Sequence, residues 1–284
     1  MTDPIIPVPE GLLIEIPGAS CRIRVDGPTW RGDVTGTIGN LAIDDPDAGR
    51  EILAISSTML EKAGRDVVLA PMDGDTWHAY RAVTESDGSP RFPLEPWSGP
   101  YDVECLEASG FEVVGRYASS RAPVPEGRQD TPGVQGVTVH AWDGSDAEGL
   151  LDRLFAMAST SFAEKDFFKE VTRDEFLSLY RPLLSSIDPR MVLFAFDAKG
   201  DLVGFLFGYV DPSSGAAVLK TYAGAYRGIG RMLAQRFHDD ARSMGRTSVV
   251  HALMHVDNVS LDRSAAHEGE VFRRYAIYAR DHRA

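Results

Sequence analysis

The sequence predicts a protein of the α+β, or mixed α/β, class that contains two unequal copies of one pattern. In each half, a helical stretch that ends at a glycine is followed at once by a strand-like stretch. These stretches span residues 50–72 in the first half and residues 231–256 in the second. Both halves then close on a similar segment, which begins at Gly110 and at Gly269. Antiparallel strands accompany the helices in both halves, and this mixture indicates the class.

The two matching helices are predicted from their apolar residues, which recur on one face of each helix. These residues are Ile52, Ile55, Met59 and Ala63 in the first half and Leu233, Phe237, Ala241 and Met244 in the second. Gly64 and Gly245 follow the helices, and glycine there favours the left-handed conformation that commonly closes a helix.

The first copy carries extra residues between its strand and its closing segment. Met72 and Met254 lie 182 residues apart, whereas Gly110 and Gly269 lie 159 apart. We place the insertion in residues 86–100, SDGSPRFPLEPWSGP, because its prolines suit an ordered loop better than a strand or helix.

The copies differ most at their starts. The second begins with two helical stretches, residues 147–162 and 172–187, and a hairpin over residues 191–211. The first has no room for the helical pair, so we expect it to be truncated. Residues 118–136 are rich in Pro, Gly and polar residues, which is typical of a linker. We divide the chain into a first domain at residues 1–124, a linker at residues 125–136 and a second domain at residues 137–284.

Composition excludes several classes of function. The formal charge is −13, from 42 acidic and 29 basic residues, and such a surface repels nucleic acid. The chain has no apolar run long enough to span a membrane and no signal-peptide pattern at its start. Its two cysteines, Cys21 and Cys105, have no disulfide or metal spacing, so we expect reduced thiols in a cytoplasmic protein.

The most informative stretch is AYRGIGRML, residues 225–233, which follows the strand-like residues 216–223. A strand, a glycine turn and a helix together present backbone N–H groups and the positive helix dipole to an anion. Arg227 and Arg231 add positive charge, so we interpret the loop as a phosphate or pyrophosphate cradle. The alternative is an ordinary turn that needs glycine. The nucleotide P-loop pattern is absent, and Leu233 replaces the third glycine of a dinucleotide-binding loop.

The order of these elements resembles the GNAT superfamily of acyl-CoA N-acyltransferases. The matching pieces are the strand VLKTYA, the loop AYRGIG, the helix at residues 231–245, the strand and Asn at residues 248–258, and the closing segment at residues 269–280. The first half resembles the last two-thirds of the same fold. The resemblance implies two tandem GNAT-like domains, each a mostly antiparallel twisted sheet flanked by helices, with a degenerate first copy.

The resemblance also implies acetyl-CoA as co-substrate, with its pyrophosphate on the loop and its pantetheine along residues 221–223. The implied cofactor-binding residues are Thr221, Tyr222, Ala223, Ala225, Tyr226, Arg227, Gly228, Ile229, Gly230, Arg231, Met232 and Asn258. The acceptor is a small-molecule amine or a peptide N-terminus, which attacks the thioester directly in a ternary complex. The chain would act as a monomer or homodimer.

Two departures from the family pattern concern catalysis. Ala225 stands where the family prefers Gln or Arg, although we expect its backbone N–H to remain available. The Tyr that protonates the departing thiolate in many members falls on Ala265, with Ser260 and Ser264 as the nearest hydroxyls. Another group or a water does that work, or the thiolate leaves unaided.

The candidate catalytic residues are therefore Ser264 and His255, the latter as a base or proton relay. We interpret His251 as a satisfied sheet residue. We expect no metal site, because His251 and His255 lie about 13 Å apart in a strand.

The first copy has DDPDAGREIL at its loop, and these carboxylates would repel a pyrophosphate. It also has Thr76 in place of Asn258. We expect this domain to bind no cofactor and to form one wall of the acceptor site, with Trp77, Phe92 and Trp97 packing the inserted loop onto the second domain.

In the second domain, we expect Phe167, Phe168 and Tyr180 to be core residues; the alternative, which the resemblance implies, is that they lie in the helical region that covers the acceptor. The acidic residues Glu164, Asp166, Glu170 and Glu175 suit an amine acceptor, or form a solvated helix face. The alternative to an enzyme is a non-catalytic acyl-CoA sensor or a GNAT-fold scaffold.

Overall fold

The structure is a computed structural model that describes residues 5–8, 11–127, 133–257, 261, 264–265 and 268–283. The elements of the first half are β1 (Ile5–Val8), β2 (Gly11–Ile16), β3 (Ala19–Arg24), β4 (Thr29–Trp30), β5 (Asp33–Val34), β6 (Gly36–Ile43), α1 (Pro46–Lys62), β7 (Val67–Ala70), β8 (Ala82–Ser86), α2 (Asp102–Ala108) and β9 (Glu112–Pro123).

The elements of the second half are β10 (Thr138–Ala141), α3 (Ala147–Phe162), α4 (Arg173–Tyr180), η1 (Arg181–Ser186), η2 (Pro189–Met191), β11 (Val192–Phe196), β12 (Leu202–Val210), β13 (Ala217–Gly224), α5 (Ile229–Ser243), β14 (Ser248–His255) and β15 (Glu270–Asp281). The mixed class is thus confirmed. Among the described residues, no helix is long and apolar enough to cross a membrane.

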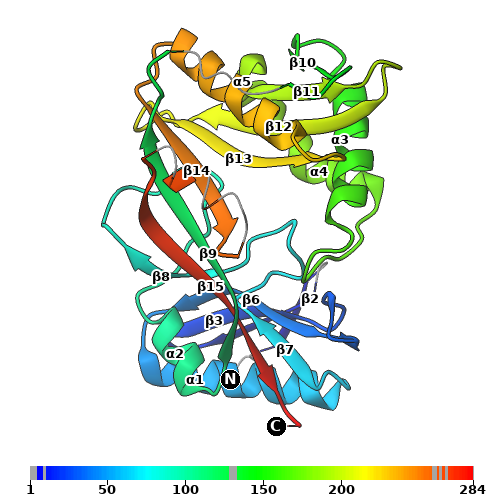
Figure 1. The fold of residues 1–284 in the computed structure, drawn as a ribbon. Coiled ribbons are helices and arrows are strands. Elements are labelled where there is room, and N and C mark those ends of the chain that lie inside the picture. Colours follow the sequence, from blue (N-terminus) through cyan, green and yellow to red (C-terminus); the bar gives the residue numbers. More distant parts are fainter. Residues whose placement is uncertain are drawn as a thin grey trace.

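One 13-stranded sheet runs through both halves in the order β1-β2-β3-β6-β7-β15-β9-β14-β13-β12-β11-β10, with β8 beside β15. The strand arrangement on one side of the sheet repeats the arrangement on the other side of the central pair β9 and β15. This pair crosses the middle of the molecule in Figure 1. On each side one pair is parallel, β6 with β7 and β13 with β14, and the other pairs are antiparallel. The helices α1 and α5 connect the strands of these two parallel pairs.

The halves exchange their last strands. The first half ends in β9, which pairs with β14 of the second half. The second half ends in β15, which pairs with β7 of the first half. Tyr117 and Tyr275, which end the two similar closing segments, lie opposite each other in the β9–β15 pair. Residues 118–123 therefore belong to a central strand, although their composition indicated a linker, because the pairing with β14 and β15 outweighs local propensity.

The missing helical pair of the first copy leaves one sheet face to be covered from the other half. Val68 and Ala70 contribute to the core beneath α1, so Leu69 points to the opposite face. There it shares a cluster with Phe167, which lies between α3 and α4 and is 2 % exposed. The ring of Phe167 lies 5.6 Å from that of Trp30. The expected core role of Phe167 is confirmed, but its partners lie in the first half.

The inserted loop docks on the second half. Phe92 is buried in the core beneath α3 and α4, and the Tyr209 hydroxyl donates to the Pro93 carbonyl. Trp77 donates its indole N–H to the Lys169 carbonyl at 2.8 Å. The predicted packing is thus confirmed for Phe92 and Trp77. It is wrong for Trp97, which is 57 % exposed because the loop turns it towards solvent.

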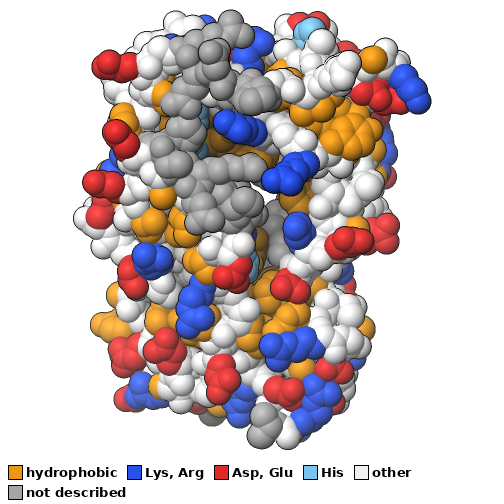
Figure 2. Space-filling view, in the orientation of Figure 1, with side chains coloured by type: hydrophobic (Ala, Val, Ile, Leu, Met, Phe, Trp, Pro, Cys, Tyr) orange, Lys and Arg blue, Asp and Glu red, His pale blue; other side chains and the backbone are white. Residues whose placement is uncertain are grey.

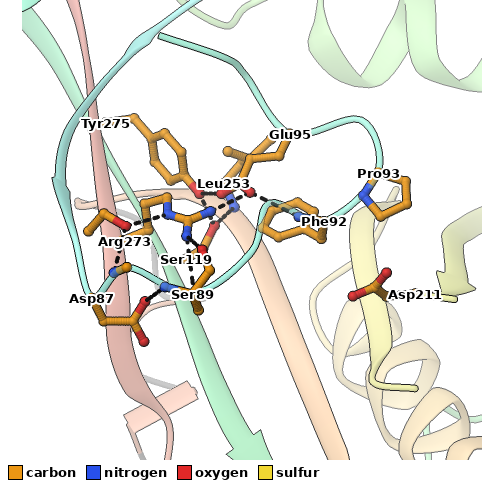
Figure 3. Close-up of polar contacts among 12 residues, drawn as sticks. Asp87, Ser89, Phe92, Pro93, Glu95, Ser119, Asp211, Leu253, Arg273 and Tyr275 are labelled. Atoms are coloured by element: carbon orange, nitrogen blue, oxygen red, sulfur yellow. Dashed lines mark hydrogen bonds and ion pairs between the residues drawn. The ribbon is translucent and has the colours of Figure 1, made fainter. Parts of the chain in front are cut away.

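A buried polar network fixes this loop to the central strands, as Figure 3 shows. Arg273 of β15 forms an ion pair with Glu95 of the loop at 2.5 Å. Tyr275 donates to the same carboxylate, and its hydroxyl lies 2.9 Å from that of Ser119 in β9. The Ser119 hydroxyl in turn accepts the backbone N–H of Leu253 in β14 at 3.0 Å. The network therefore joins both exchanged strands to the inserted loop.

Candidate active site

A cleft of about 2400 Å³ opens between the two halves. It begins where β13 and β14 separate, because among the described residues these strands pair only over Ala217–Leu219 and Val249–His251. The α3–α4 region forms one wall, and residues 76–81 and 94–96 of the first half form another. Figure 2 shows acidic and basic side chains mixed over one face of the molecule, with basic ones around a hollow in its middle.

Both strands that border the cleft are irregular at the level where they part. In β13, Lys220 is the extra residue between two paired positions, Leu219 opposite Gly208 and Thr221 opposite Phe207. In β14, the pairing with β9 shifts between His251 and Met254, and Leu253 has a left-handed φ of 56°. Bulges of this kind redirect side chains and are common beside functional sites.

The glycine loop lies at one end of the cleft and leads into α5. Gly228 is the N-cap of α5, and no side chain caps the helix there. Arg227 and Arg231 are exposed, and neither has an ion-pair partner among the described residues. At the equivalent place in the first half, the Asp45 carboxylate accepts the Ala48 N–H at 2.8 Å. One helix start is therefore open to an external anion, and the other is already capped by an internal one.

Both glycines of the loop also have a structural role. Gly228 has a φ of +104°, and a Cβ there would come within 2.9 Å of Val134. A Cβ on Gly230 would come within 2.7 Å of the Tyr222 ring. The turn thus needs glycine for its own packing, so the argument for an anion site rests on the uncapped helix and the two arginines.

The structure brings most of the predicted cofactor-binding residues to the cleft. Those that line it are Thr221, Tyr222, Ala223, Ala225, Tyr226, Arg227, Gly228, Gly230 and Arg231. Ile229 is instead buried beneath the sheet, and the sulfur of Met232 accepts the Val134 N–H at 3.1 Å. Asn258 and Ser260 lie outside the described residues.

One expectation about Ala225 is wrong. Its backbone N–H donates to the Val203 carbonyl at 2.9 Å, which extends the β12–β13 pairing by one residue. This N–H is therefore not available to a phosphate.

The two predicted catalytic residues both line the cleft but belong to different groups of contacts. Ser264 is buried, and its hydroxyl lies 2.7 Å from His251 Nδ1 and also contacts the Ser120 hydroxyl. His251 Nε2 lies 3.0 Å from His238 Nε2, so at most one of these two facing nitrogens carries a proton. His251 is thus satisfied within the sheet, as expected, and also connects Ser264 to α5.

His255 lies further along β14, with its ring edge-on to Tyr117 at 5.0 Å. Its Nδ1 accepts the Asp257 N–H at 3.2 Å, so in the neutral ring Nε2 carries the proton and is a donor. To act as a base, His255 must give up the contact with Asp257 or change its tautomer. Of the other predicted residues, Phe168, Tyr180, Glu164 and Asp166 also border the cleft. Glu170 does not line it, and Glu175 is occupied in capping α4 through Thr172.

Sequence reasoning missed two basic residues of the cleft. Lys220 gave a weak signal, a charge within the strand-like stretch VLKTYA. Burial and the nearby Arg81 together lower the pKa of Lys220 to about 7, although Glu95 acts in the opposite direction. Arg81 comes from the first half, and nothing in its local sequence placed it near Lys220 of the second.

Residues 119–253, just under half of the chain, match the family model described as an acetyltransferase (GNAT) domain. This part of the chain is thus similar to a GNAT acetyltransferase domain. The match begins within β9, the strand that the first half contributes to the second.

Solved structures with the GNAT fold cover nearly the whole chain. A tandem GNAT protein from the clavulanic acid biosynthesis pathway has a TM-score of 0.55 and 16 % identity, over 95 % of this chain and 82 % of that one. A GCN5-related N-acetyltransferase from Sphaerobacter thermophilus has a TM-score of 0.54 and 14 % identity, over 96 % and 80 %. At these identities the likeness is one of fold. The comparison with curated proteins found no match.

The tandem arrangement predicted from the internal repeat is therefore confirmed as a fold. The GNAT domain supports acyl transfer as the general class of reaction. The cleft combines an open helix start, a strand edge that is unpaired among the described residues, and titratable side chains.

Proposed function

We propose that the protein is an N-acetyltransferase that moves an acetyl group from acetyl-CoA to a primary amine by direct attack in a ternary complex. The observation that carries the proposal is the uncapped start of α5, which lies with Arg227 and Arg231 at one end of the cleft between β13 and β14. In this proposal the two arginines and the helix start bind the pyrophosphate, and the pantetheine extends along β13 beyond Leu219.

The reaction then needs a group that takes a proton from the acceptor ammonium. We assign this role to Lys220, because it lies at the bulge where the strands separate and its lowered pKa leaves a substantial fraction of it unprotonated near neutral pH. The neutral acceptor nitrogen forms a bond to the thioester carbon and the carbon–sulfur bond breaks. The proton that the nitrogen then loses is taken up by the departing thiolate, so the products are the amide and the free thiol of coenzyme A. His255 is the second candidate for the base. Ser264 is not favoured, because it is 2 % exposed.

The first half supplies a wall of this site and binds no coenzyme of its own. Besides the Asp45 cap, its strands β6 and β7 leave no open gap, since the Met72 N–H donates to the Ile38 carbonyl at 2.8 Å. Asp73 follows there and pairs with Arg24 at 3.1 Å. The free buried thiols Cys21 and Cys105 suit a cytoplasmic location.

The deciding experiment is titration calorimetry of acetyl-CoA into the wild-type protein and into Arg227→Gln/Arg231→Gln. These side chains are exposed, so the substitution leaves the fold intact. Losing two charge-assisted contacts is expected to weaken binding by about 100-fold. Arg50→Gln is the control, because Arg50 lies near the start of α1 and its loss should leave the affinity unchanged.

No binding of acetyl-CoA to the wild-type protein would contradict the proposal. Binding without acetyl transfer to any amine would instead favour an acyl-CoA sensor.

A further inference from the structure

Arg81 is a buried cation of the cleft, and none of the described carboxylates forms an ion pair with it. It precedes β8 in the first half, is 8 % exposed and borders the cleft. Its backbone has a left-handed φ of 82°, which is uncommon for a residue with a side chain. The backbone N–H donates to the Pro71 carbonyl at 3.0 Å, so the residue is fixed at this point of the loop.

Two aromatic rings hold the guanidinium in place. Its central carbon lies 4.0 Å from the centre of the Tyr80 ring and 3.7 Å from that of Tyr117. Nη2 donates to the Tyr80 hydroxyl, whereas the buried Nε has no hydrogen-bond partner among the described residues. A buried donor without a partner costs free energy, so its retention needs an explanation.

No described carboxylate forms an ion pair with Arg81. Glu95, which acts on the pKa of the neighbouring Lys220, is already occupied. It accepts from Arg273, from Tyr275 and from the Phe92 N–H at 3.1 Å, as Figure 3 shows. Lys220 adds a second basic group to the same part of the cleft. The inner cleft thus has basic side chains in excess, in a protein that is acidic as a whole.

We propose that the acceptor amine also carries a carboxylate, and that the guanidinium of Arg81 binds this carboxylate inside the cleft. The proposal rests on the acetyl transfer proposed above and specifies its substrate class. A carboxylate would satisfy the unpaired Nε and supply the missing negative charge, and an arginine held rigidly by two rings is suited to such a contact. The cleft walls include Trp77, Phe168, Phe176 and Tyr180, so the body of the acceptor is apolar.

The test compares acceptors that differ in the carboxylate alone. L-Phenylalanine, L-phenylalaninamide and phenethylamine are assayed with acetyl-CoA by thiol release, and L-leucine with its amide and decarboxylated amine forms a second set. The amide and the amine bracket the basicity of the amino acid. We expect kcat/KM of the wild-type protein to be higher for the acids than for both neutral partners by about 10- to 100-fold.

The variants Arg81→Gln and Arg81→Lys show whether Arg81 is the cause. Arg81→Gln should abolish the preference for the acids, and Arg81→Lys should restore part of it. Because Arg81 also lowers the pKa of Lys220, any change in rate that acids and neutral amines share is assigned to Lys220, and only the ratio of their kcat/KM values reports the carboxylate contact. Arg31→Gln is the control, because Arg31 also lies over an aromatic ring, that of Trp30 at 4.2 Å, but outside the cleft. Equal rates for acids and neutral amines in the wild-type protein would overturn the proposal, as would an equal loss for all acceptors in Arg81→Gln.

A second measurement separates this site from the transfer reaction. Calorimetry with N-acetyl-L-phenylalanine and its amide, in the presence of coenzyme A, reports the carboxylate contact without turnover. Binding of the acid alone, lost in Arg81→Gln, would support the site even if every transfer assay failed. Equal binding of the acid and the amide would refute the site even if acetyl transfer were observed.

Discussion

At the scale of single residues, Lys220 has the environment that a general base needs. Its position at the bulge of β13 places it where the two strands part, and burial together with Arg81 disfavours its ammonium form. With a pKa of about 7, a substantial fraction of Lys220 is unprotonated at neutral pH. An ordinary lysine would be almost fully protonated there and could not accept a proton.

The rate should therefore depend on pH in a defined direction. Because the base works in its unprotonated form, kcat/KM should fall about tenfold per pH unit below pH 7, on the limb governed by Lys220. Lys220→Met should lower kcat/KM by about 10²–10⁴-fold and remove this limb. A pH–rate profile with acetyl-CoA and an active amine checks both. An unchanged limb in Lys220→Met would assign the base elsewhere, with His255 as the next candidate.

Stability provides the control for that substitution. The folded pKa of Lys220 is about 7 and the unfolded value about 10.5, so between these pH values the unfolded chain binds more protons. The contribution of Lys220 to stability consequently rises with pH through this window. Lys220→Met should unfold at the same temperature as the wild-type protein or higher, with the largest gain below pH 7. A lower unfolding temperature would mean that lost activity reflects damage to the fold.

At the scale of elements, α1 and α5 follow the same strand–helix–strand pattern but differ in how their first turns are capped. Both helices follow a strand of a parallel pair, but Asp45 caps α1 while α5 starts at a bare glycine. Asp45→Ala should cost about 1 kcal/mol of unfolding free energy, because the Ala48 N–H loses its acceptor. Urea denaturation measures this loss. Acetyl-CoA affinity should not change, and a weaker affinity would show that the first half takes part in binding the coenzyme.

The positions of many helices and strands were predictable from the sequence. The apolar spacing in α1 and α5 and the glycines after them located both helices, and the strand before Gly228 placed the loop. The pairing partners were not predictable, because a strand carries no local mark of which neighbour it will take. The position of Arg81 in the cleft could not be predicted for the same reason. Strand pairing positions the loop that holds Arg81, and this brings the side chain near Tyr117 and Lys220. The N–H of Ala225 was misjudged because β13 extends its pairing by one residue.

At the scale of the whole molecule, the exchanged strands make the two halves one unit. The ion pair of Glu95 and Arg273 lies buried where the inserted loop, β15 and β9 meet. Glu95→Ala should destabilise the protein by about 3–5 kcal/mol, because Arg273 would remain buried without its partner. Denaturation followed separately through Trp30 and Trp142 should give one coincident transition that shifts as a whole. Two separate transitions would show that the halves unfold independently.

The repeated strand arrangement within one chain affects which substitutions the cleft can accumulate. Two identical subunits that exchange strands must carry two identical clefts, and every substitution appears in both. A duplicated chain has no such restriction, because each copy accumulates its own substitutions. Here residues 76–81 of the first copy line the cleft of the second, and Asp45 closes the helix start that the second copy leaves open. The first copy thus contributes a wall to the cleft of the second while its own helix start is closed.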